Sequence, residues 1–278
     1  MNKIIILDTT MRDGELKPGI KFSLQEKISI SKLLEEMGVD VIEVGYPGSS
    51  SANYQQVLQI SQIINNSTIC GLAGANKKEI IAVAQAIKPA KRGRIHTYNN
   101  VNLSNKDKFK LEQELESIKY HISVARQYCG EVQWSAFDAP RSEPDFLCKA
   151  IETAINSGAT IINIPDSLGL SSLEEFSQLL QMIFNQVANI DKVVVSVHCH
   201  NDLDKAVENS IISLNYGVRQ IECAINGLGA RAGNANLEEI VREISEKENY
   251  QTNIKASLMS KVSNLVAQIT GINKQLKV

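Results

Sequence analysis

The clearest chemical signal in the sequence is a pair of histidines separated by one residue. His198 and His200 lie in the run Ser196-Val-His-Cys-His-Asn-Asp202, which follows an apolar segment. Side chains two residues apart on a strand point to the same face, so both imidazoles can reach one point. A lone histidine is more often a satisfied core residue, whereas a pair at this spacing favours a metal site over a structural pair.

A second cluster of charged residues follows the apolar run at residues 4–7. It reads Asp8-Thr-Thr-Met-Arg12-Asp13-Gly14-Glu15. If Asp13 reaches the two histidines, the three side chains offer two nitrogens and one oxygen to a divalent metal, with open positions for Mg, Mn, Fe, Co or Zn. The alternative is a buried structural pair of Arg12 and Asp13.

A glycine-rich segment, Asn226-Gly-Leu-Gly-Ala-Arg-Ala-Gly-Asn234, is the third candidate. One interpretation is a tight turn with Asn234 as the N-cap of the next helix. The other is a backbone cradle for an anion, or Asn234 directed towards the metal. Three further polar segments follow apolar runs and can equally be loop caps: residues 96–97, 135–138 and 163–169.

The elements that must position these residues alternate along the chain. Short apolar, β-branched runs predict eight strands, at residues 3–7, 41–44, 68–72, 94–98, 132–136, 160–164, 192–198 and 220–224. Segments with helical periodicity lie between them, at residues 24–37 (N-cap Ser23, stop Gly38), 111–128, 144–156, 172–187, 203–216 and 237–246. The strands are near-continuously apolar, as in parallel sheets covered on both faces.

Eight such strand–helix units in a chain of 278 residues predict an α/β fold, a (β/α)8 TIM barrel. We expect residues 1–250 to form the barrel and residues 251–278 a C-terminal helical extension, with a helix at 256–269. In such a barrel the first and seventh strands flank the eighth, and the chemistry lies at the carboxyl ends. Asp13 and the two histidines should therefore meet.

Composition excludes several classes of protein. The 29 Lys and Arg residues nearly balance the 31 Asp and Glu residues, so no global field gathers nucleic acid or an anionic membrane. No apolar stretch is long enough for a membrane span or a signal peptide. The five cysteines are scattered without C-x-x-C spacing, which indicates reduced thiols. We therefore expect a cytoplasmic protein without nucleic-acid or membrane partners.

With these motifs in place, the chain resembles the catalytic barrel of the isopropylmalate synthase and homocitrate synthase family, within the DRE-type metallolyase superfamily. The resemblance extends from Leu7 to about Val241 and rests on three signatures, residues 8–15, 196–203 and 226–234. Linking stretches agree at residues 38–43, 94–97, 144–147 and 162–166.

The resemblance implies a metal-dependent Claisen condensation of acetyl-CoA with a 2-oxo acid, giving a 2-hydroxy-2-carboxymethyl acid and CoA. It implies Asp13, His198 and His200 as metal ligands with Asn234 near or on the metal, and Arg12 as the cation over the reacting oxygen. His96 and Ser167 would line the 2-oxo acid pocket, and the loop with Gly229, Arg231 and Gly233 would lie near the acyl donor. Glu15 is a candidate general base by proximity alone.

The sequence departs from the family pattern near the expected pocket. Leu16 replaces the usual Gln after Glu15, and Phe137 stands where an acidic residue is usual. Ser167 replaces Thr, Ala230 replaces the Glu before Arg231, and Asn105 replaces a His. We interpret Leu16 and Phe137 as a pocket adapted to a different, more apolar side chain, with lost activity as the alternative.

Two rival functions remain open at this point. One is a carbon–carbon lyase or aldolase on the same metal site, and the other is a non-catalytic or half-enzyme subunit. Relatives that condense acetyl-CoA carry a linker region after the barrel, whereas only residues 256–278 follow here. We therefore expect no feedback inhibition by an end-product amino acid, and either a barrel that works alone or a second polypeptide that completes it. A homodimer is expected from the family.

Overall fold

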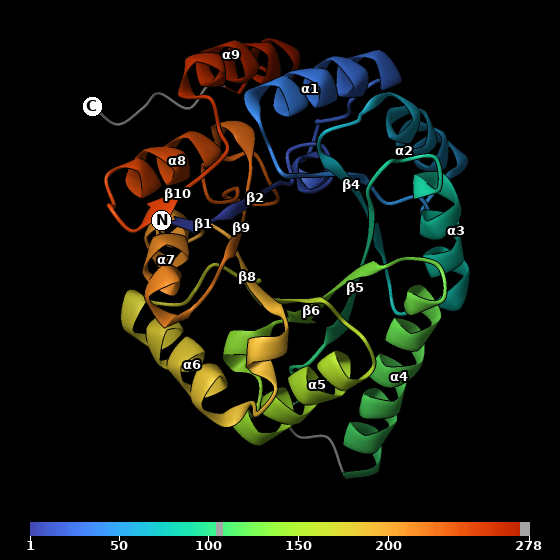
Figure 1. Cartoon of the computed structure of the whole chain (residues 1–278), viewed down its shortest axis with the longest axis vertical. Coiled ribbons are helices and arrows are strands. Elements are labelled where there is room, and N and C mark those ends of the chain that lie inside the picture. Colours follow the sequence, from blue (N-terminus) through green and yellow to red (C-terminus); the bar gives the residue numbers. More distant parts are fainter. Residues whose placement is uncertain (104–107, 273–278) are drawn as a thin grey trace.

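The centre of the computed structural model, which describes residues 1–103 and 108–272, is a closed ring of eight strands (Figure 1). Every neighbouring pair is parallel, and β2 closes the ring by pairing with β9. The strands are β2 (Ile5–Asp8), β3 (Val41–Gly45), β4 (Thr68–Ala73), β5 (Gly93–Asn100), β6 (Glu131–Phe137), β7 (Ile161–Asp166), β8 (Val194–Cys199) and β9 (Gln220–Cys223). The predicted TIM barrel is confirmed.

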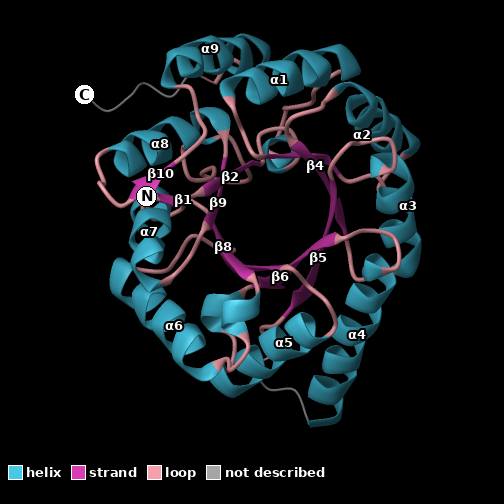
Figure 2. Ribbon diagram, in the orientation of Figure 1, coloured by secondary structure: helices cyan, strands magenta, loops and turns pink. Residues whose placement is uncertain are grey.

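The helices surround the ring on its outside, as Figure 2 shows. They are α1 (Leu24–Met37), α2 (Ser51–Ile63), α3 (Lys77–Ile87), α4 (Lys108–Arg126), α5 (Pro144–Asn156), α6 (Leu173–Gln186), α7 (Ala206–Ile212), α8 (Leu237–Ser245) and α9 (Met259–Thr270). The predicted start and stop of α1 are confirmed. Ser23 and Glu26 form a capping box, and Gly38 ends the helix at φ 97°, where a Cβ would lie 2.3 Å from the Asn253 carbonyl oxygen.

One predicted helix start and one candidate N-cap are wrong, although the predicted start of α8 at Leu237 is confirmed. The helix expected from Leu203 begins at Ala206 and continues as a 3-10 turn, η4 (Ser213–Tyr216). The chain before it forms a turn instead, because Asp204 has a positive φ of 57° and the Asn201 side chain accepts a hydrogen bond from the Ala206 amide. The N-cap of α8 is Asn236, whose side chain accepts from the Glu239 amide, which leaves Asn234 for another role.

The interior of the barrel is more polar than the apolar strands predict. The outward side chains of the strands join the helices in one large apolar core, whereas Leu7, Val41 and Cys70 form a separate small cluster. Arg94 is buried and donates to the side chains of Gln133 and Gln220 at 3.0 and 2.7 Å. Buried polar groups are tolerated when they pair in this way, so the barrel can carry a charged site above this layer.

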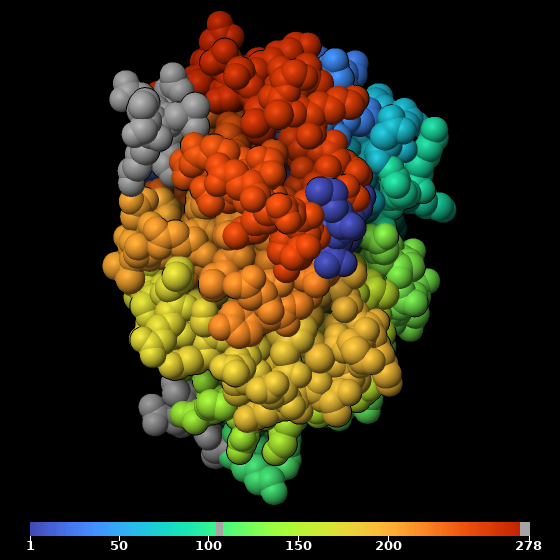
Figure 3. All heavy atoms as spheres, turned by 60° about the vertical axis from the view of Figure 1, so that its left-hand side comes forward, coloured from blue at the N-terminus to red at the C-terminus, as the bar shows by residue number. Residues whose placement is uncertain are grey.

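Both ends of the described chain pack against the barrel. β1 (Asn2–Lys3) pairs in parallel with β10 (Tyr250–Gln251), and Figure 3 shows the first residues against the late segment of the chain. The helix predicted at 256–269 is present as η6 (Ala256–Leu258) and α9, and α9 lies beside α1 (Figure 1). All five cysteines are free, as predicted. In the described part of the chain, no helix has the length and apolar character needed to cross a membrane.

Asp8, at the end of β2, gives a testable pH dependence of stability. Burial raises the pKa of its carboxyl from the ordinary 3.8 to about 7, although hydrogen bonds from Thr10 oppose the rise. The folded chain therefore binds this proton more tightly than the unfolded chain. The contribution of Asp8 to stability is fully present below pH 3.8 and is lost as the pH rises through about 7.

Between pH 4 and 7, we expect the free energy of unfolding to decrease less with rising pH in Asp8→Asn than in the parent chain. The difference between the two proteins should reach about 1–4 kcal/mol at the upper end. Urea unfolding of both proteins at several pH values measures it. Equal pH slopes for both proteins would show that Asp8 is already ionised in the folded chain.

Candidate metal and anion site

Asp13 lies in a short 3-10 turn, η1 (Asp13–Leu16), that follows β2 at the carboxyl end of the barrel. Its Oδ1 accepts from Arg12 Nη1 at 2.6 Å, and its Oδ2 accepts from Asn234 Nδ2 at 2.9 Å and from the Ala230 amide at 3.2 Å. Burial opposes ionisation, but Arg12, His198 and His200 outweigh it and hold the pKa of Asp13 well below its usual range. The carboxylate is therefore charged and available to a cation.

His198 and His200 meet above the end of β8, with ring centroids 4.9 Å apart. His198 Nδ1 lies 3.0 Å from Glu222 Oε2, which orients the ring and leaves Nε2 as its ligand atom. Burial, reinforced by His198, lowers the pKa of His200 to about 3. His200 is therefore neutral at pH 7, the form in which an imidazole binds a metal.

One ligand atom from each of Asp13, His198 and His200 lies within 4.8 Å of the others. Two neighbouring buried polar atoms, His200 Nδ1 and Asn234 Oδ1, have no hydrogen-bond partner among the described residues. Buried polar atoms in proteins are almost always satisfied, so unsatisfied atoms in one cluster indicate a missing partner. The donor set fits a divalent cation bound by nitrogen and oxygen ligands.

A glycine makes room for Asn234 beside this cluster. A Cβ on Gly229 would lie 2.6 Å from the Asn234 Cγ and Oδ1 atoms. Gly233 has a φ of 104°, and a Cβ there would lie 2.2 Å from the Gly227 carbonyl oxygen. Side chains at these positions would displace Asn234, so the glycines shape the loop that faces the metal cluster.

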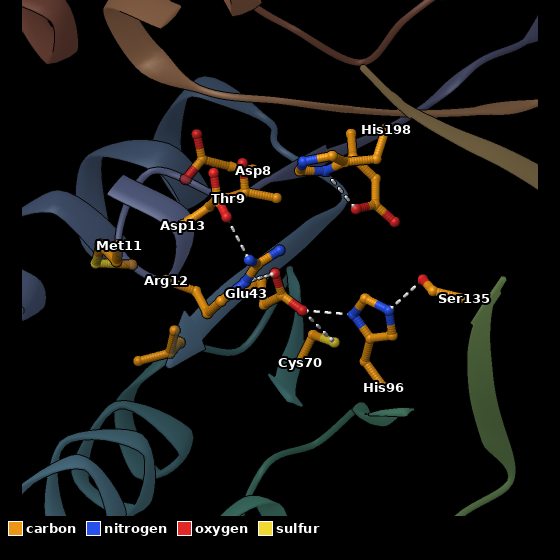
Figure 4. Close-up of polar contacts among 12 residues, drawn as sticks. Asp8, Thr9, Met11, Arg12, Asp13, Glu43, Cys70, His96, Ser135 and His198 are labelled. Carbon is orange, nitrogen blue, oxygen red and sulfur yellow. Dashed lines mark hydrogen bonds and ion pairs between the residues drawn. The ribbon is translucent and has the colours of Figure 1, made fainter. Parts of the chain in front are cut away.

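Arg12 links the metal cluster to a chain of buried side chains, shown in Figure 4. Its Nε donates to Glu43 Oε2 at 2.6 Å while Nη1 holds Asp13. With two of its three nitrogens engaged, the guanidinium plane is fixed. In the described part of the chain nothing bonds Nη2, which leaves it available to an incoming anion.

Glu43 also sets the tautomer of His96. Burial opposes its ionisation, but Arg12 and His96 lower the pKa of Glu43 to about 2, so the ionised carboxylate accepts a hydrogen bond from His96 Nδ1 at 2.6 Å. His96 Nε2 then accepts from the Ser135 hydroxyl at 2.7 Å, and Ser135 accepts from Asn163 Nδ2 at 2.8 Å. Asn163 Oδ1 is buried without a partner among the described residues. The chain thus ends in a polar atom that a ligand can satisfy.

The chain is similar to known proteins along nearly its whole length. The chain matches the HMGL-like family over residues 3–266. The chain belongs to the HMGL-like family. It is 46% identical over 281 residues to a 2-isopropylmalate synthase of Caulobacter vibrioides (strain NA1000 / CB15N), and 44% identical over 280 residues to one of Rhodopseudomonas palustris (strain HaA2). Each match covers 99% of this chain and 53% of the relative. The chain thus spans about half the length of the curated relatives it matches.

A solved structure shares the fold of this chain. The chain superposes on a hydroxymethylglutaryl-CoA lyase from Pseudomonas aeruginosa with a TM-score of 0.81, covering 99% of this chain and 96% of that one. Sequence identity is 18%, so this likeness establishes the fold alone.

The residues predicted for the oxo acid pocket of this HMGL-like barrel do not all lie together. His96 lies in the buried chain with Arg12 and Glu43, whereas the Ser167 hydroxyl accepts from the Asp138 amide at 2.9 Å. Phe137 is 41% exposed at the end of β6, and Leu16 is 61% exposed in η1, the turn that follows β2. Phe137 lies against Tyr98, with ring centroids 6.2 Å apart. The two apolar replacements therefore lie on the rim, above the buried polar groups. Asn105 lies outside the described residues.

Arg231 is held on the same rim of the HMGL-like barrel. Its guanidinium pairs with Asp202 at 2.9 Å and donates to the Ser167 carbonyl at 2.8 Å. Arg231 has a positive φ of 51°. It therefore ties the glycine-rich loop to the loops after β7 and β8.

Glu15 is engaged by a buried lysine of α1. Lys27 is fully buried, and its Nζ bonds Glu15 Oε2 at 2.9 Å and the carbonyls of Met11 and Val44 at 3.1 and 2.9 Å. Glu15 Oε1 accepts from the Phe22 amide. This arrangement favours a role in holding the Arg12–Asp13 loop over the general-base role expected from proximity.

We expect Glu15→Gln to destabilise the protein while leaving much of its turnover, because the change leaves Lys27 as an uncompensated buried charge. The loss in the free energy of unfolding should be about 3 kcal/mol, whereas removal of a general base costs about 10²–10⁴ in rate. Urea unfolding and turnover below the melting temperature separate the two. A large loss of turnover at unchanged stability would restore Glu15 as a base.

Sequence reasoning missed Glu43, Glu222 and Lys27. Glu43 interrupts the otherwise apolar strand Val-Ile-Glu-Val-Gly, and Glu222 lies between two apolar residues in Gln-Ile-Glu-Cys. A carboxylate inside a buried strand needs a partner, so these interruptions were the available signal. No pattern marked Lys27, whose neighbours on α1 are typical of a surface helix.

Proposed function

We propose that this chain is the catalytic barrel of a 2-isopropylmalate synthase, which condenses acetyl-CoA with a 2-oxo acid and releases CoA. The observation that carries the proposal is the convergence of Asp13, His198 and His200 within 4.8 Å, with Arg12 fixed beside them. The identity to enzymes of that name along nearly the whole chain favours condensation over the lyase alternative.

A divalent cation (Mg, Mn, Fe, Co or Zn) would be held by Asp13, His198 and His200, with Asn234 beside them. When bound, it supplies a Lewis acid that polarises the ketone of the 2-oxo acid. Arg12 offers its Nη2 to the ketone oxygen and stabilises the negative charge that develops there as the carbon–carbon bond forms. The carbon nucleophile is the methyl of acetyl-CoA after loss of a proton, and hydrolysis of the thioester releases CoA.

We propose an acceptor with an apolar side chain and a single carboxylate. Phe137 and Leu16 present apolar groups on the rim. Besides Arg12, whose Nη2 faces the ketone, two arginines at this end of the barrel are already paired, Arg141 with Asp138 and Arg231 with Asp202. A second carboxylate on the substrate would have to compete for them, which disfavours dicarboxylic oxo acids.

The test is release of free CoA thiol from acetyl-CoA by the purified chain with Mn²⁺ or Mg²⁺. The panel pairs 3-methyl-2-oxobutanoate and pyruvate with 2-oxoglutarate and oxaloacetate. We expect release that depends on an apolar oxo acid. Release with the dicarboxylic acids alone would overturn the substrate class, and cleavage of a hydroxy acid without CoA would support a lyase. Silence across the panel with metal bound would support a barrel that needs a second chain.

A further inference from the structure

Helix α9 is bonded directly to the start of the loop that carries Asn234. Asn226, 4% exposed, begins this loop in the left-handed conformation, with φ 56°. Its Nδ2 donates to the Ser263 carbonyl at 3.0 Å, and its Oδ1 accepts from the Ser263 hydroxyl at 2.5 Å. Ser263 lies in α9, so one buried amide connects the last described helix to the functional loop.

Two short routes lead from Asn226 to the metal cluster. The carbonyl of the next residue, Gly227, accepts from the Asn234 amide at 3.0 Å, and Asn234 in turn bonds Asp13. The side chain of Leu228 packs against Gly14, in the turn that carries Asp13. A Cβ added to Gly14 would lie only 2.7 Å from this side chain. A shift of Asn226 would therefore move contacts on both sides of Asp13.

Other bonds of this region fix the backbone around Asn226, and one of their partners, Glu238, also bonds the Ser263 side chain. The Asn226 amide donates to Glu238 of α8 at 3.2 and 3.3 Å. The Ile225 amide donates to Thr10 Oγ1 at 2.8 Å. Removal of the Asn226 side chain thus deletes its direct bonds to Ser263 and leaves these backbone bonds in place.

We propose that Asn226 is a positioning residue for the Asp13–His198–His200 cluster. Through its bonds to Ser263, it couples the position of α9 to the affinity of that cluster for a divalent cation. The inference rests on the proposed function only in taking that cluster as a metal site. It assigns α9 a role in the site, although no α9 side chain touches the cluster.

The experiment compares Asn226→Gly and Ser263→Ala with the parent chain. Glycine keeps the left-handed backbone and removes the amide, and alanine removes only the hydroxyl. Ser263→Thr retains the hydroxyl and should restore parental behaviour. Ser260→Ala, at an exposed position of the same helix, is the matched control. The probe is Mn²⁺ alone, measured by calorimetry and by its electron paramagnetic resonance signal.

We call Asn226→Gly and Ser263→Ala the latch variants, because each removes part of the Asn226–Ser263 contact. We expect Mn²⁺ affinity to fall between about twofold and thirtyfold in both of them. Ser263→Thr and Ser260→Ala should stay at the parental value. Amide hydrogen exchange of residues 227–234 should rise in the two latch variants without metal present. Parental affinity and parental exchange in Asn226→Gly and Ser263→Ala would overturn the proposal, as would an equal loss in Ser260→Ala.

Failure of the proposed function would look different. In that case the parent itself would not bind Mn²⁺, and the exchange of residues 227–234 would still decide whether Asn226 and Ser263 hold the loop. Faster exchange confined to the latch variants would support the coupling, and unchanged exchange would reject it.

Discussion

Replacing His200 by alanine is expected to abolish tight binding of a divalent cation and to reduce turnover to background, while the barrel still folds. His200 is neutral at pH 7 because burial lowers its pKa to about 3, and its Nδ1 is buried without a partner in the described structure. Removing it deletes one of the three proposed ligands without removing a charge. Loss of a supporting outer partner already costs about 10–100-fold in metal affinity, so loss of a ligand should cost more.

Mn²⁺ titration and thermal unfolding of His200→Ala and the parent measure the two effects separately. His121→Ala is a suitable control because His121 lies on α4, where Ser117 is its hydrogen-bond partner, away from the cluster. Its metal affinity should equal the parental value. Unchanged Mn²⁺ binding in His200→Ala would remove this residue from the metal site and with it the main support for the proposed function.

The second large effect is expected for Arg12→Lys. Arg12 donates to Glu43 through Nε and to Asp13 through Nη1, each at 2.6 Å. These two hydrogen bonds fix the plane of the guanidinium and therefore the direction of Nη2. A lysine keeps the positive charge but cannot make both contacts and also reach a substrate oxygen. We expect turnover to fall by about 10²–10³, the usual cost of one lost donor to a developing oxyanion.

Metal binding should survive Arg12→Lys, because Arg12 is not among the proposed ligands. Steady-state kinetics with the preferred oxo acid, together with Mn²⁺ titration, test both halves of the prediction. Arg242→Lys is the matched control, since Arg242 lies on α8, half exposed, and pairs with Glu243. Near-normal turnover in Arg12→Lys would show that charge alone suffices and that the planar fork has no role.

The sequence allowed the barrel to be predicted because its strands are short, apolar and evenly spaced, and because helices such as α1 carry local start and stop signals. Ser23, Glu26 and Gly38 act within a few residues of each other, so their roles can be inferred without a structure. The positions of Asp13, His198 and His200 were also accessible. Their convergence needs only strand alternation and the neighbourhood of the first, seventh and eighth strands.

The rest of the site depends on contacts between distant strands. Glu43 bonds His96 and Gln133 bonds Glu222 between strands that are not neighbours in the ring, and Asn234 bonds Asp13 where β9 closes on β2. These pairs are set by the register and closure of the barrel, which no local pattern specifies. The turn before α7 was missed for a related reason, since Asn201 satisfies the Ala206 amide and replaces the first turn of the predicted helix.

The pairing of β2 with β9 has a consequence for how the protein is made. Ile5 pairs with Gln220, so one edge of β2 has no partner until the final strand of the ring leaves the ribosome. At ~5–20 residues per second, this interval lasts roughly ten to forty seconds. An exposed, apolar strand edge is a template for pairing with other chains. Nascent chains of this barrel should therefore depend on chaperones until β9 emerges.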